Sequence, residues 1–169
     1  MIVETKSSKR YKSENYNYLF NKNNGFFARW GGTIDDDPEF APSPEIADIE
    51  ITSICNAGSK NGSKPKCNLC YKSNTSKGIN MSFETFKKIF NSLPKSLTQI
   101  AFGVDYDATS NPDLIKMMKY SRDNGVIPNL TVAELSNETA TEIVKYAGAV
   151  AVSQYFNKEK IKKFYKRLK

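Results

Sequence analysis

The sequence contains no histidine, and this absence narrows the chemistry open to the protein. Without an imidazole there is no Ser-His or Cys-His nucleophile pair and no His-Glu-x-x-His zinc motif. Proton transfer would fall to Asp, Glu, Lys, Tyr or Cys side chains. The sequence therefore excludes the enzyme classes whose chemistry depends on histidine.

Long apolar runs and paired cysteines are also missing. No stretch approaches the roughly 18 apolar residues of a membrane span, and residues 1–6 lack the apolar core of a secretory signal. Cysteine occurs three times, and an odd number argues against a secreted disulfide framework. We therefore expect a cytoplasmic protein without a membrane partner.

Positive charge is abundant and unevenly distributed. The net charge is +7, and residues 157–169 hold seven Lys or Arg against one Glu. A basic helix of this kind is either a solvated outer face or a surface that binds nucleic acid. Nucleic acid therefore stays open as a partner.

Two regions differ in pattern. Residues 1–45, rich in Lys, Asn, Ser and Tyr, are predicted to be an irregular N-terminal extension that packs on the main body through its aromatic residues. From residue 46 to 169, strands alternate with helices. Strands are expected at about 47–53, 99–102, 126–132 and 149–153, and helices after the capping residues Ser82, Asn111, Ser136 and Asn157.

Four successive strand–helix units predict an α/β fold with a parallel sheet. In such sheets, ligands bind at the carboxyl ends of the strands. The three cysteines, Cys55, Cys67 and Cys70, follow the first strand as Cys-x11-Cys-x2-Cys. Three thiolates without a fourth soft ligand suit an iron–sulfur cluster in which one iron has no protein ligand.

The segment from Ile51 to Cys55, followed by Cys67-Asn68-Leu69-Cys70-Tyr71, resembles the radical S-adenosylmethionine superfamily. The resemblance spans residues 46–156, although the family spaces its first two cysteines by three residues. Residues 16–38 and 97–112 look like phage- and microbe-associated members. The resemblance implies a partial β/α barrel, a [4Fe–4S] cluster and reductive cleavage of S-adenosylmethionine to a 5′-deoxyadenosyl radical that abstracts hydrogen from an unidentified substrate.

The resemblance also implies roles for particular residues. Leu69 would lie near the adenine of S-adenosylmethionine. Gly103 and Asp105 stand where the family has a Gly-Gly-Glu-type motif that contacts the methionine amino group. The ribose or the methionine carboxylate would be approached by Asn129, Thr131 and Ser153. A flavodoxin- or ferredoxin-like electron donor is the implied partner.

The expected barrel is partial, with about four parallel units. No counterpart of the family's later strands follows, so the fourth strand would be an uncovered edge. We expect a truncated member of the family or a second chain that completes the barrel. Three alternatives stay open: a zinc site with a carboxylate as fourth ligand, a nucleic-acid-binding module, and a catalytically inactive remnant.

Overall fold

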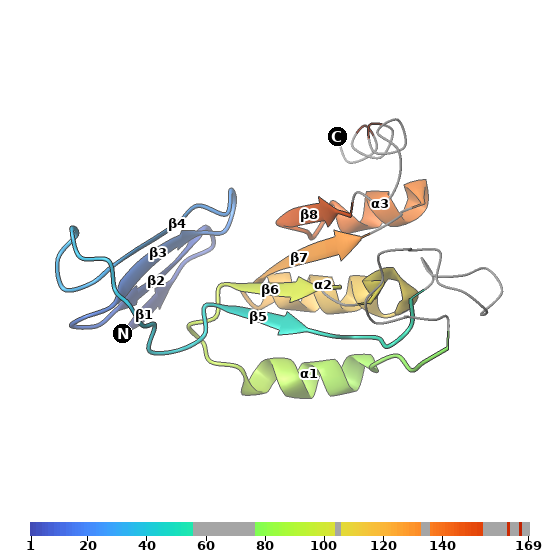
Figure 1. The fold of residues 1–169 in the computed structure, drawn as a ribbon, viewed down its shortest axis with the longest axis horizontal. Helices are drawn as coiled ribbons and strands as arrows, with labels where there is room; N and C mark the ends of the chain where they lie inside the picture. The colour runs from blue at the N-terminus through green and yellow to red at the C-terminus, as the bar shows by residue number, and fades with distance from the viewer. Residues whose placement is uncertain (56–76, 104–105, 133–135, 154–161, 163–165, 167–169) are drawn as a thin grey trace.

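The computed structural model describes residues 1–55, 77–103, 106–132 and 136–153, together with Lys162 and Lys166. This part of the chain contains two four-stranded sheets, one parallel and one antiparallel (Figure 1). None of the helices in these ranges is long and apolar enough to cross a membrane. Of the helix expected after Asn157, the structure describes Lys162 and Lys166, and both are helical.

The parallel sheet confirms the α/β class. Its strands lie in the order of the sequence and are β5 (Ile46–Ile49), β6 (Gln99–Phe102), β7 (Ile127–Val132) and β8 (Ala149–Val152). The helices between them are α1 (Phe83–Ser92), α2 (Leu114–Asp123) and α3 (Asn137–Ile143). A short 3₁₀ turn, Ala108–Ser110, precedes α2. Closure into a barrel is not seen in this four-stranded sheet.

The main core lies between the parallel sheet and its helices. Phe86 of α1 is fully buried, and its ring packs against those of Phe90 and Phe102. Met117 and Met118 of α2 are equally buried in the same cluster. Because strand side chains alternate between faces, the buried residues occupy every second position of β6 and, from Pro128 onward, of β7.

Two of the predicted helix starts are confirmed by their caps. The Ser82 hydroxyl accepts a hydrogen bond from the Thr85 amide, and the Ser136 hydroxyl accepts one from Thr139. The predicted start at Asn111 is wrong, because α2 begins at Leu114. The Asn111 side-chain oxygen accepts from the Asp113 amide at 2.8 Å, and its side-chain amide donates to the carbonyls of residues 51 and 81, at 2.7 and 2.9 Å.

The prediction of an irregular N-terminal extension is wrong for residues 2–30. They form an antiparallel sheet of β1 (Ile2–Glu4), β2 (Ser8–Lys12), β3 (Asn17–Asn21) and β4 (Phe27–Trp30), in that order. Tight turns join the strands, and Gly25, at φ 74°, permits the β3–β4 turn. These strands are short and largely polar, so their sequence does not show the apolar alternation from which a strand is predicted.

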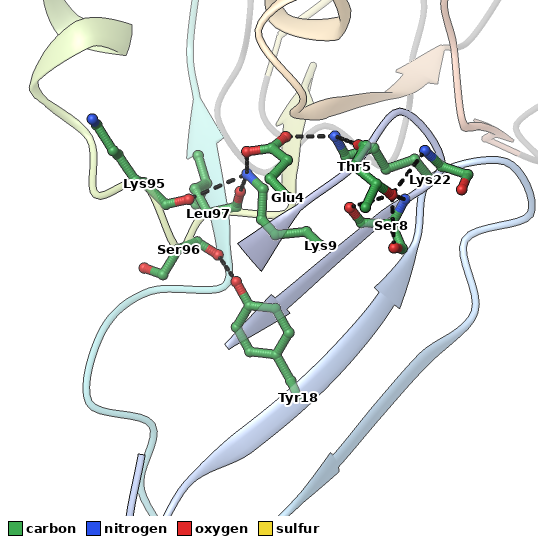
Figure 2. A network of polar contacts seen from close by, with 10 residues as sticks. Glu4, Thr5, Ser8, Lys9, Tyr18, Lys22, Lys95, Ser96 and Leu97 are labelled. Atoms are coloured by element: carbon green, nitrogen blue, oxygen red, sulfur yellow. Dashed lines mark hydrogen bonds and ion pairs between the residues drawn. The ribbon is translucent and has the colours of Figure 1, made fainter. Parts of the chain in front are cut away.

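The antiparallel sheet packs on the amino ends of β6 and β7. Tyr16, Tyr18 and Phe20 form a buried cluster with Ile127 at the start of β7. Figure 2 shows the polar contacts beside this cluster. The Tyr18 hydroxyl donates to the Ser96 carbonyl at 2.5 Å, and Lys9 reaches the same loop. The antiparallel sheet therefore lies away from the carboxyl ends of the parallel strands.

Because the Tyr18 hydroxyl is buried, the free energy of unfolding is expected to fall at alkaline pH. Burial, followed by the nearby Glu4 and Tyr11, raises the pKa of Tyr18 from 10.0 to about 12. The folded state thus holds the phenol proton that the unfolded state releases above pH 10, so stability is lost as pH rises from 10 towards 12.

We expect Tyr18→Phe to lose about 1 kcal/mol at pH 8, because the hydrogen bond to Ser96 is gone. This deficit should shrink or reverse by pH 11.5, since the variant has no phenol to ionise. Urea unfolding at both pH values tests this. Burial also lowers the pKa of Lys9, but both proteins contain Lys9, so its titration does not contribute to the difference in stability between them. A constant deficit would contradict the prediction.

Candidate functional site

The face of the parallel sheet opposite the helices is lined with small and polar side chains. The strand register aligns Asp48, Ala101, Asn129 and Ala149 in one row, and Thr131 with Ala151 in the next. The adjacent row of Ile49, Phe102, Leu130 and Val150 belongs to the core. We use the name exposed face for the residues on this side of the sheet, which are Asp48, Glu50, Ala101, Asn129, Thr131, Ala149, Ala151 and Ser153.

Gly103 follows β6 and closes against the end of β7. Its φ is +77°, a conformation that residues with a Cβ rarely adopt. A Cβ built on it would lie 2.6 Å from the Thr131 carbonyl oxygen and 3.2 Å from the Ala108 Cβ. Two predicted site residues, Gly103 and Thr131, are therefore in direct backbone proximity at the carboxyl edge.

The segment after β5 positions Cys55 at the same end of the sheet. Beyond Ile49 the chain pairs with residues 79–81 in place of β6, because the Met81 amide donates to the Ile51 carbonyl. The Ser53 amide donates to the Ile79 carbonyl at 2.9 Å, and Thr52 forms a bridge with Asn80. The half-buried Cys55 comes two residues after Ser53.

These hydrogen bonds hold together the described residues that flank the segment with the other two cysteines, residues 56–76. The Ile79 amide, for example, also donates to the Ser53 hydroxyl at 2.9 Å. Gly78 is so close to Ser53 that an added Cβ would lie 2.6 Å from the Ser53 carbonyl oxygen. The described residues on both sides of 56–76 therefore lie at the carboxyl edge. Cys67, Leu69 and Cys70 lie outside the described residues, as does Asp105.

The remaining predicted residues lie on or beside the exposed face. Asn129 donates its side-chain amide to Gln99 Oε1 at 2.8 Å, towards the amino end of the sheet. Ser153 extends the ladder beyond β8, because its amide donates to the Val132 carbonyl at 2.9 Å. The structure thus brings Gly103 and Thr131 together at the carboxyl edge. The side-chain amide of Asn129 is hydrogen-bonded to Gln99 and lies further from that edge.

Two carboxylates on the exposed face were missed by the sequence analysis. Asp48 is exposed, and Glu50 is half-buried with its Oε2 atom out of contact with solvent. The sequence Asp48-Ile49-Glu50-Ile51 could have predicted this position, because its two isoleucines are buried on one face and the alternation of an extended chain places both acids on the other. Asp107 has a structural role, because it caps the 3₁₀ turn through the Thr109 amide.

Among the described residues, no group of three Cys, Asp or Glu side chains is arranged to hold a metal ion, and Cys55 is the one cysteine they include. A scan against protein-family models found no match, and searches of curated proteins and of solved structures found none either.

Proposed function

We propose that this chain is a radical S-adenosylmethionine enzyme whose parallel sheet is part of a β/α barrel. The observation that supports this most is that the residues on both sides of 56–76 are hydrogen-bonded to each other at the carboxyl edge, where Gly103 also meets Thr131. This edge is where α/β folds bind ligands. The donor set fits the group, since thiolates are the usual ligands of iron–sulfur clusters.

In this proposal, Cys55, Cys67 and Cys70 hold three irons of a [4Fe–4S] cluster. When bound, the cluster supplies an electron for reductive cleavage of S-adenosylmethionine. The protein orients the cofactor and excludes water from it. The alanines of the exposed face, Ala101, Ala149 and Ala151, leave room above the sheet for a ligand.

The polar residues would orient S-adenosylmethionine. Asp105 would accept from the methionine amino group beside Gly103, whose tight turn lets the chain approach the ligand. Thr131 and Ser153 would donate to the carboxylate or ribose, with Asn129 below them, and Leu69 would cover the adenine. An electron donor of the flavodoxin or ferredoxin type and a second chain that completes the barrel belong to the same proposal.

Anaerobic reconstitution with iron and sulfide tests the cluster. We expect a brown protein with about four iron and four sulfide per chain. Replacement of Cys55, Cys67 or Cys70 with Ala should abolish the cluster absorbance, whereas Ser59→Ala should leave it intact. A colourless protein containing one zinc, or full absorbance in a cysteine variant, would contradict the proposal.

Turnover distinguishes an enzyme from an inactive remnant. Reconstituted protein, S-adenosylmethionine and a strong chemical reductant should yield 5′-deoxyadenosine, detected by mass spectrometry. A full cluster that yields none would retain the metal site and reject the enzymatic activity of the chain alone.

A further inference from the structure

The antiparallel sheet has a second face, directed away from the parallel sheet, that the proposed function does not use. Lys9, Tyr18 and Phe20 point inward, so strand alternation directs Arg10, Lys12, Leu19 and Trp30 outward. We call these four residues, with Asn17, the outer face. The register aligns Lys12, Asn17 and Trp30 in one row across three strands and Arg10 with Leu19 in the next.

This outer face is hollowed and basic. A shallow cavity of 710 Å³, within the range of about 300–1,000 Å³ for ligand sites, is lined by the outer-face residues together with Tyr11, Ser13, Glu14, Tyr18 and Gly32. Arg10 and Lys12 are exposed, and neither makes an ion pair within the described chain. Residues 1–30 hold six Lys or Arg against two Glu, and of these cations Lys9 and Lys22 are buried and paired with Glu4.

Trp30 adds an aromatic surface to this charge. It is half-buried at the end of β4, and two strand spacings separate it from Lys12, about 10 Å. Cations beside an aromatic ring are the combination that binds single-stranded nucleic acid, because phosphates pair with the cations and unstacked bases stack on the ring. A duplex offers phosphates but keeps its bases stacked, so Trp30 favours a single strand.

We propose that the outer face of the antiparallel sheet binds single-stranded nucleic acid, with a base on Trp30 and phosphates on Arg10 and Lys12. Residues 157–169, the basic segment identified from the sequence, are not needed for this contact. The proposal is also independent of the cysteine site, since the two surfaces belong to different sheets.

Trp30 is the single tryptophan of the chain, so its fluorescence reports on this surface alone. Titration of the full-length protein with a 12-nucleotide oligothymidine should quench that fluorescence. Arg10→Gln combined with Lys12→Gln should weaken binding about tenfold and reduce the slope of log K against log salt by about 1.4. The control Lys88→Gln with Lys95→Gln removes two exposed charges elsewhere and should have a much smaller effect.

Anisotropy of a labelled oligonucleotide extends the test to Trp30 itself. Trp30→Leu should weaken binding about tenfold, and Trp30→Phe should restore part of it, because phenylalanine still stacks. Binding without quenching, and unaffected by the Arg10 and Lys12 changes, would overturn the proposal and place the contact elsewhere. Equal affinity for a duplex, or equal quenching by polyglutamate, would also overturn it.

Discussion

Replacing Lys9 with methionine is expected to lower the free energy of unfolding by about 3 kcal/mol. Lys9 is only 2% exposed, and its Nζ donates to the carbonyl of Leu97 at 2.6 Å and that of Lys95 at 3.2 Å. Glu4 Oε2 lies 3.7 Å away (Figure 2). Methionine fills the space of the lysine stem but leaves the two carbonyls without this donor.

The loss of stability should be smaller than the loss caused by leaving a buried charge without a partner, because Glu4 keeps its contact with Lys22 at 2.5 Å. Urea unfolding at pH 7.5 measures the change. The matched control is Lys12→Met on the same strand, where the side chain points outward and is exposed; it should change stability by less than about 0.5 kcal/mol. Equal effects of the two substitutions would show that Lys9 does not join the sheets.

Local signals explain why much of the parallel sheet was predictable. The apolar alternation at 99–102 gives β6 its observed bounds, and Ser82 and Ser136 cap helices through hydrogen bonds to residues three positions on. Where the signal is not local, the prediction fails. Asn111 accepts from the Asp113 amide as a cap does, but α2 begins only at Leu114, and the side-chain amide of Asn111 bonds to residues 51 and 81, which no local pattern reveals.

The antiparallel sheet was missed for a related reason. Lys9 occupies an inward position in β2, so the strand lacks an apolar alternation, and only the distant carbonyls at 95 and 97 make a lysine acceptable there. At the candidate site, topology predicted that Gly103 and Thr131 share an edge. Their contact depends on the positive φ of Gly103, which a single sequence does not specify.

The closure of Gly103 against β7 leads to the second large expected effect. Gly103→Ala should lower the free energy of unfolding by about 2–4 kcal/mol. The substitution costs about 1–2 kcal/mol for the left-handed backbone, and the new methyl would also lie 2.6 Å from the Thr131 carbonyl oxygen. Because that oxygen belongs to the backbone of β7, it can move only if the ends of both strands separate.

Gly25→Ala is the matched control for this prediction. Gly25 has nearly the same φ, +74°, but nothing lies within 4 Å of its added Cβ. It should therefore lose only the conformational cost of about 1–2 kcal/mol. Urea unfolding of the two variants isolates the steric contribution as their difference, and equal losses would mean that the Gly103–Thr131 contact is absent. If the proposed function is correct, Gly103→Ala should in addition weaken S-adenosylmethionine binding, because displacing these strand ends moves Thr131, whereas Gly25→Ala should leave binding unchanged.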